Sequence, residues 1–594
     1  MRKKIWKAIL YVLSIVIIIV TVSIAIVVKA TNQYRPSVYN YESYLSPQII
    51  QKLKTKYNYK EFKEISEFTQ AITQEKAIAG VGSDFQAAQL IIDKKIQKFD
   101  FELIYGPGSN EWENRKKYYT PNTVKHLEDF DALILSKLDQ MEKEGKDTGF
   151  IIDRNQSGEA LNYRIKNSEP SKFNGGWDHF YDYILPYYTQ DKGIAYNINE
   201  KTRPNLNVSK AEEQLNEATL KFEWQQIFNV LKGSNYEHFG WTNAYLDNLM
   251  IGAMTYGEGW EEKFTKNVKG TQLFNFGEDN YKIAIDSFNR FIKSATGHDI
   301  KDTKFNFLTS DGLELLNHLI EPKNGRSDAA VMYNGDALDA YYSEDNFSTV
   351  EEGNVRFVRP KYNYILMDNW ILSKGLTKEE ADTFTRTLGE LLYHNNQGNE
   401  NYDSKLMATS IAEVETQFFK EFKEQLSDSI IEEQKQLLIN ELTPLTNEEK
   451  SKVIDLIKEE FADADITQDS FVKWNEEKFD NFINNPVDSK NYEWFLIMRD
   501  NLENGYKLFE DVLADLFSDS SISDIANFDY VSYTPTNRIT YEFVLKWYFA
   551  GDETAITIFE QPESTNEYKL FSYPIIDNNL RTKISTYYYE TTKS

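Results

Sequence analysis

The chain has 594 residues, so it is long enough to form several hydrophobic cores. Its formal net charge of −27 argues against nucleic-acid binding, because contacts to phosphate groups need a basic surface. Cysteine is absent, which excludes disulfides, thiolate metal sites, a thiol nucleophile and a lipid anchor attached through cysteine.

The N-terminus has the pattern of a membrane-spanning segment. Four basic residues within positions 2–7 precede the uncharged run Ala8–Val28, which is rich in isoleucine and valine. Such a run is about long enough to cross a hydrocarbon core of ~30 Å, and its basic flank should stay in the cytoplasm. The sequence therefore predicts a single-pass protein of the cell membrane whose C-terminal bulk is extracellular. A cleaved signal peptide with its cleavage site at residues 28–30 is the alternative.

Strand-like and helix-like segments alternate after residue 34, which indicates an α/β architecture. Strands are expected at Val38–Tyr44, Ala77–Val81 and Gly193–Asn197, and helices at Pro47–Lys54, Phe85–Ile92, Phe222–Leu231, Ala244–Tyr256 and Lys282–Thr296. The stretch from Gly106 to about Gly176 is expected to be loop-rich, because it opens with glycine and proline and has low periodicity.

Two strand-like runs in the middle of the chain end at polar residues. Ala329–Met332 is predicted to enter a turn at residues 333–336, and Ile365–Met367 to end at Asp368. Ligands bind at the carboxyl ends of strands in open α/β sheets, so these ends are candidate site elements. Ser83 and Asp84 precede a predicted helix whose N-terminus would face a cleft; the alternative is that they only cap the helix.

Residues 400–526 differ from the rest of the exported chain. They combine helical periodicity with many acidic residues and few glycines or prolines, which predicts an inserted acidic α-helical subdomain. Helices are expected at Ala408–Leu426, Glu448–Phe461, Ser470–Ile483 and Tyr492–Ser518. Strand and turn signals return from Asn527, with a turn at Tyr533–Asn537.

Motifs of common enzymes and metal sites are missing from the sequence. It has no phosphate loop, dinucleotide fingerprint, zinc-protease motif or nucleophile elbow, and its six histidines are scattered. The segment from Asp463 fails as a calcium loop, because Gln468 replaces the required glycine and Trp474 the final glutamate. We therefore expect no cofactor, no metal and no catalytic residue, and predict that the protein is not an enzyme.

Six segments, in chain order, resemble the spermidine/putrescine-binding family of periplasmic-type substrate-binding proteins of ABC transporters. They are Tyr39–Tyr44, Gly82–Phe85, Leu185–Asn197, Trp241–Tyr256, Tyr333–Gly335 together with Met367-Asp368, and Tyr533–Asn537. The resemblance implies a type II periplasmic-binding-protein fold, in which two α/β lobes surround a cleft. The implied division is an N-terminal transmembrane anchor or signal at 1–30, lobe 1 at 35–190 and 368–399, lobe 2 at 191–367 and 527–594, and the helical insertion at 400–526.

The resemblance also implies the ligand and its contacts. A polyamine such as spermidine or putrescine would bind in the cleft, with Asp368 pairing with an ammonium group and Asp247 as a loosely matched second acid. Cation–π contacts of ~0.5–2 kcal/mol each would come from aromatic walls. The implied aromatic residues are Tyr41, Tyr44, Phe85, Tyr333 and Tyr533, and the implied neutral hydrogen-bonding residues are Ser83 and Asn334.

Three departures from the family pattern remove expected ligand contacts. The family's paired acids in the Trp241–Tyr256 segment have only Asn243 and Asp247 as approximate counterparts. Ser43 stands where the family has an acid, although Glu42 is adjacent, and Leu366 stands where it has a tryptophan. The implied function is the extracellular solute-binding component of an ABC importer, with permease and ATPase subunits as partners. Two alternatives stay open: a membrane-anchored adhesion or assembly protein that uses residues 400–526 for interaction, and the same fold binding another small solute.

Overall fold

The computed structural model describes residues 20, 21, 23, 35–63, 65–323, 325–343, 350–393, 411–549 and 552–593. The predicted membrane-spanning run Ala8–Val28 lies almost entirely outside these residues. Among the residues that are described, no helix is long and apolar enough to cross a membrane. The N-terminal anchor and the extracellular location therefore stay predictions.

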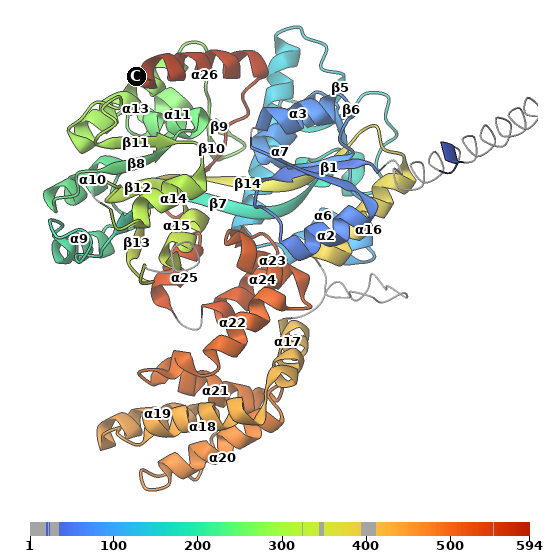
Figure 1. Cartoon of the computed structure of the whole chain (residues 1–594). Coiled ribbons are helices and arrows are strands. Elements are labelled where there is room, and N and C mark those ends of the chain that lie inside the picture. Colours follow the sequence, from blue (N-terminus) through green and yellow to red (C-terminus); the bar gives the residue numbers. More distant parts are fainter. Residues whose placement is uncertain are drawn as a thin grey trace, which may run out of the picture.

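A mixed sheet runs through the described part of the molecule and confirms the predicted α/β class (Figure 1). Its main path has the strand order β11-β8-β12-β7-β14-β3-β1-β2. The first half contains the parallel strands β1 (Ser37–Tyr41), β2 (Asn58–Phe62) and β3 (Ala79–Ser83). The second half contains the parallel strands β8 (Phe239–Thr242), β11 (Asn306–Thr309) and β12 (Ala329–Tyr333).

Two long strands join the halves. β7 (Ile184–Asn197) and β14 (Tyr362–Ser373) pair antiparallel, from Ile365 opposite Asp191 to Ile371 opposite Ile184. β14 also pairs antiparallel with β3, and β7 pairs antiparallel with β12. In each half, the carboxyl end of a parallel strand therefore lies beside a crossing strand.

Shorter strands complete the sheet and form two separate hairpins. The added strands are β4 (Ile96–Gln97), β13 (Val355–Val358), β15 (Thr534–Pro535) and β16 (Lys569–Ser572). The hairpins are β5 (Phe150–Arg154) with β6 (Ala160–Ile165), and β9 (Thr265–Val268) with β10 (Thr271–Phe274).

Helices accompany both halves of the sheet. With the first half are α2 (Pro47–Lys56), α3 (Ile65–Thr73), α4 (Asp84–Ile92), α5 (Glu102–Tyr105), α6 (Trp112–Arg115), α7 (Pro121–Lys143), α8 (Phe180–Tyr183) and α16 (Lys378–Leu392). With the second half are α9 (Val208–Asn216), α10 (Trp224–Gly233), α11 (Tyr245–Met254), α12 (Trp260–Phe264), α13 (Tyr281–Thr296), α14 (Gly312–Ile320) and α15 (Asn334–Tyr341).

Three local predictions are wrong. The stretch from Gly106 to Gly176 contains α7 and a hairpin, because Thr120 caps a helix that begins at a favourable N-terminal proline. Residues 333–336 form no separate turn, since α15 begins at Asn334. Asp368 lies inside β14 and not at its end, because β7 and β3 pair with the strand beyond a bulge that follows Asp368.

A helical subdomain with its own hydrophobic core lies below the sheet in Figure 1. Its helices are α17 (Ile411–Gln425), α18 (Asp428–Leu442), α19 (Asn447–Glu460), α20 (Phe471–Asn484), α21 (Ser489–Asn501) and α22 (Glu510–Asp519). The predicted helix Tyr492–Ser518 is therefore two helices, with a 3₁₀ turn between them. The core continues past residue 526 to Phe543 and Trp547.

The division of the remaining chain into two lobes stays a prediction.

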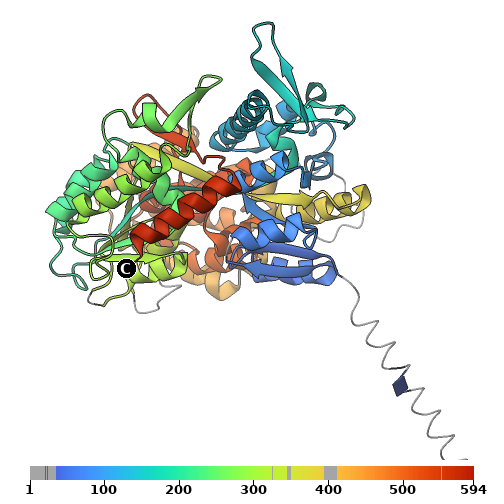
Figure 2. The same cartoon turned by 90° about the horizontal axis from the view of Figure 1, so that it is seen from above.

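The segment after Asn527 contains the short strands β15 and β16, in agreement with the strand signals there, but most of it is helical. Its elements include α23 (Ser523–Val531), α24 (Arg538–Phe543), α25 (Glu553–Phe559) and α26 (Asn578–Thr592). Figure 2 shows α26 lying over the second half, with its N-terminal end reaching toward the first half. There the Arg581 guanidinium lies 5.8 Å from the ring centroid of Phe85 on α4.

Gly335 is required where α15 begins, because a Cβ atom at this position would collide with the ring of Tyr533. Tyr533 is held by a hydrogen bond to Asp336 and by packing on Tyr44, so it has little freedom to move away. We predict that Gly335→Ala lowers the free energy of unfolding by about 1–3 kcal/mol, as overpacking does.

Urea unfolding checks this prediction, with Gly233→Ala on α10 as the matched control. The nearest atom to a Cβ at Gly233 is the flexible Lys210 Nζ, at 3.6 Å, so the control should be close to neutral. Equal stability of the two variants would contradict the packing argument.

Candidate functional site

Asp368 is buried where the two crossing strands meet β3. Its side chain accepts hydrogen bonds from Tyr44 Oη at 2.9 Å, Ser83 Oγ at 3.0 Å and Gln190 Nε2 at 2.8 Å. Burial raises the pKa of the Asp368 carboxyl to about 7, although these three hydrogen bonds oppose the rise. Within the described ranges, no lysine, arginine or histidine forms an ion pair with Asp368. The carboxyl therefore has hydrogen-bond donors but no counter-charge.

Aromatic side chains surround this carboxyl. The Tyr41 hydroxyl lies 3.0 Å from Ser83 Oγ. The Tyr41 ring packs edge-on against the Tyr44 ring, with the centroids 5.7 Å apart. The Tyr533 ring lies 5.5 Å from the Tyr44 ring. The structure thus brings five of the predicted site residues together, although they come from four separate parts of the chain: Tyr41, Tyr44, Ser83, Asp368 and Tyr533.

A second buried cluster forms around Asp247, the first-turn acid of α11. Lys192 Nζ lies 2.9 Å from Asp247 Oδ2 and 2.9 Å from Thr242 Oγ1. The Tyr333 and Tyr573 hydroxyls donate to Asp247 at 2.9 and 2.7 Å. The same lysine nitrogen lies 3.5 Å from the centroid of the Tyr333 ring. Asp247 and Tyr333 therefore lie together, and the chain's own lysine contacts both of them.

The remaining predicted residues have structural contacts near the junction. The Phe85 ring stacks on Tyr573 with centroids 4.9 Å apart. Asn334 donates to Thr534 Oγ1 at 2.9 Å and accepts from the backbone of Asp191 at 3.2 Å. Their participation in ligand binding, like that of the other predicted site residues, stays a prediction.

Strand β7 connects the two acidic clusters. Gln190 and Lys192 are two positions apart, so their side chains share one face of the strand and reach Asp368 and Asp247 respectively. Asp191 points to the opposite face, where Arg359 binds it through Nε at 2.6 Å. The whole of β7 is buried, which makes these three polar residues unusual for their position.

The positions of Asp368 and Lys192 correspond to one another in the two halves. Asp368 on the crossing strand β14 lies opposite Ser83, the last residue of β3. Lys192 on the crossing strand β7 lies opposite Tyr333, the last residue of β12. Equivalent sheet positions therefore carry opposite charges.

Ser83 does more than precede a helix. It is the N-cap residue of α4, but its side chain makes no capping hydrogen bond and donates to Asp368 instead. The neighbouring Asp84 is fully buried, and its Oδ2 lies 2.6 Å from His126 Nε2. Burial raises the pKa of Asp84, whereas His126 lowers it. The capping alternative for the Ser83 side chain is therefore wrong.

Three important residues were not predicted as site residues: Gln190, Lys192 and Tyr573. The sequence signal for the first two is a Gln-Asp-Lys run between two strongly apolar segments. Charged residues inside a buried strand must find partners, so the run itself predicts buried polar contacts. Tyr573 had no such signal, because tyrosine is common throughout this chain.

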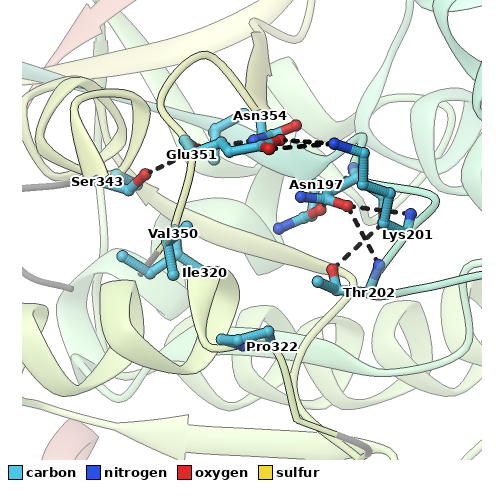
Figure 3. A pocket seen from close by; sticks show the side chains of 12 residues that line it. Asn197, Lys201, Thr202, Ile320, Pro322, Ser343, Val350, Glu351 and Asn354 are labelled. Carbon is cyan, nitrogen blue, oxygen red and sulfur yellow. Dashed lines mark hydrogen bonds and ion pairs between the residues drawn. The ribbon is translucent and has the colours of Figure 1, made fainter. Parts of the chain in front are cut away.

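A cavity of about 190 Å³ lies away from both clusters, at the carboxyl end of β7 (Figure 3). Its lining includes Asn197, Lys201, Ile320 and Glu351, and the Lys201 ammonium pairs with Glu351 at 3.0 Å. None of the predicted site residues lines this cavity. Within the part of the chain that the structure covers, no group of three or more acidic or histidine side chains is placed to hold a metal ion.

No protein-family model matches the chain, and neither does any curated protein. Among solved structures, it is similar to a putative spermidine/putrescine ABC transporter from Listeria monocytogenes, with 13% identity over 60% of this chain and 79% of the other, at a TM-score of 0.33. The spermidine/putrescine substrate-binding protein PotD of Streptococcus pneumoniae is 12% identical over 60% of this chain and 78% of its own, with a TM-score of 0.34. The glucopine-bound protein MotA of A. tumefaciens is 12% identical over 60% of this chain and 78% of its own, with a TM-score of 0.32.

The raised pKa of Asp368 predicts a pH-dependent stability. The folded-state pKa of about 7 exceeds the unfolded value of about 3.9, so this group stabilises the fold below pH 4 and the contribution is lost as the pH rises through 7. At about 1.4 kcal/mol per pKa unit, the loss is up to about 4 kcal/mol. About 2.6 kcal/mol of this loss falls between pH 5 and pH 8. Asp368→Asn should remove that difference, which urea unfolding at the two pH values measures.

The matched control for this experiment is Asp515→Asn, an exposed position on α22. It should keep the wild-type difference between the two pH values. If Asp368→Asn keeps that difference as well, Asp368 does not titrate as the structure indicates.

Proposed function

We propose that this chain is a solute-binding protein that holds an organic amine at Asp368, in the junction between two lobes of a type II periplasmic-binding fold. One observation carries the proposal: the buried Asp368 carboxyl is surrounded by three neutral donors and, in the described residues, has no basic partner. An ammonium ligand would supply the missing positive charge.

The energetics of buried charge favour such a ligand. A desolvated carboxylate is costly unless it is paired, and a charge-assisted hydrogen bond to an ammonium group is about twice as strong as a neutral one. The rings of Tyr44 and Tyr533 add aromatic faces beside the carboxyl. The net charge of −27 also favours the approach of cations over that of anions.

The sheet topology supports a protein that closes around its solute. Both crossing strands pass from the first half to the second, so bending of β7 and β14 would change the angle between the halves without breaking their pairing. With the resemblance described above, this arrangement favours a polyamine-type solute and delivery to an ABC permease and its ATPase. Binding without catalysis is part of this proposal, as is tethering to the membrane through residues 8–28.

Isothermal titration calorimetry at pH 8 tests the proposal. Putrescine and spermidine should bind to the protein, whereas 1,4-butanediol, which has the putrescine chain length without its charges, should not. Asp368→Asn should weaken amine binding by about tenfold or more, because a hydrogen bond to a charged group contributes about 1.5–3 kcal/mol. Asp515→Asn is the matched control and should bind as the wild type does.

Binding should also be weaker at pH 5.5 than at pH 8, because Asp368 must be ionised to pair with the amine. The proposal is wrong if neither amine binds, or if the Asp368→Asn variant binds them as tightly as the wild type.

A further inference from the structure

Lys192 makes the contacts that an external ammonium group would make in a binding site. Its nitrogen is bonded to a carboxylate, Asp247, and to a hydroxyl, Thr242, at 2.9 Å each. The Tyr333 ring covers it, with the centroid 3.5 Å away. The lysine side chain is 0% exposed. A carboxylate, a hydroxyl and an aromatic face are the groups that recognise an ammonium ion in proteins.

Asp247 is fully engaged by side chains of this chain. Lys192 and the Tyr333 hydroxyl share Oδ2, and the Tyr573 hydroxyl donates to Oδ1 at 2.7 Å. A competing ligand would have to displace the lysine and leave its ammonium buried and unpaired. Breaking a buried ion pair in this way is strongly unfavourable.

The two acids are contacted from neighbouring positions on one face of the same strand. Gln190 and Lys192 contact Asp368 and Asp247 from positions separated by about 7 Å along β7. The two acids differ in the charge of their partners. Asp368 accepts hydrogen bonds from neutral donors, whereas Asp247 is paired with the Lys192 ammonium group.

We infer that Lys192 fills an ammonium subsite at Asp247, so that the junction accepts a single external ammonium group, at Asp368. The inference rests on the proposed function and narrows its substrate class. The ligand would be an amine whose second charge, where it has one, contributes nothing to binding. Lys192 would then be the residue that removes a preference for linear diamines over monoamines.

Wild-type protein gives the first test. Butylamine and putrescine share a four-carbon chain and differ by one ammonium group, so calorimetry compares the two directly. Their dissociation constants should agree within about threefold, because Lys192 already neutralises Asp247. A preference for putrescine of more than about tenfold, or about 1.4 kcal/mol, would overturn the inference.

Lys192→Ala gives the second test, because it opens the subsite and leaves Asp247 without its cation. Methylammonium should raise the melting temperature of this variant more than that of the wild type, because only the variant offers Asp247 in addition to Asp368. Putrescine should gain at least about tenfold over butylamine. Lys192→Met is the matched control, since it keeps the side-chain volume and should show neither effect. The double variant Lys192→Ala with Asp247→Asn should lose both effects.

The outcomes separate the inference from the proposed function. If Asp368 does not bind amines, butylamine fails to bind the wild type, yet methylammonium still stabilises Lys192→Ala through Asp247 and supports the subsite. If the subsite assignment is wrong, butylamine binds through Asp368 and methylammonium stabilises the folded Lys192→Ala variant no more than it stabilises the wild type. Should Lys192→Ala not fold, the wild-type comparison of butylamine with putrescine decides.

Discussion

The antiparallel pairing of β7 with β14 is the constraint on which the remaining structure depends. The two strands stay paired from Ile365 opposite Asp191 to Ile371 opposite Ile184, and they carry the parallel strands of both halves on their outer edges. This pairing fixes which residues of the crossing strands lie beside the carboxyl ends of β3 and β12. Asp368 and Lys192 occupy those two places, so the sheet itself sets the charge pattern of the junction.

Among the described residues, three buried acids around this pairing have a basic partner, whereas Asp368 has none. Asp191 pairs with Arg359, Asp247 with Lys192 and Asp84 with His126, and each acid is almost fully buried with its partner. In the first two pairs, the Coulomb attraction and the hydrogen bonds oppose the cost of losing hydration. Asp368 has hydrogen bonds alone, which explains why burial raises its pKa to about 7. This missing basic partner is the observation on which the proposed amine site rests.

The sequence correctly predicted those elements whose hydrophobic periodicity can be seen within the element itself. The strand before Ser83, the helices near residues 222–296 and the acidic helical subdomain all lie close to their predicted ranges. Asp368 was expected at a strand end because its polarity interrupts an apolar run, but pairing on both sides carries β14 onward. The partner of Lys192 was not predictable either, because Asp247 is 55 residues away and only the fold brings the two together.

The most direct test of this account is a crystal structure of the protein with butylamine bound at pH 8. The account predicts the amine nitrogen within about 3 Å of the Asp368 carboxylate, between the rings of Tyr44 and Tyr533, with Lys192 still on Asp247. An amine bound at Asp247 in place of Lys192, or bound only in the cavity beside Glu351, would contradict it.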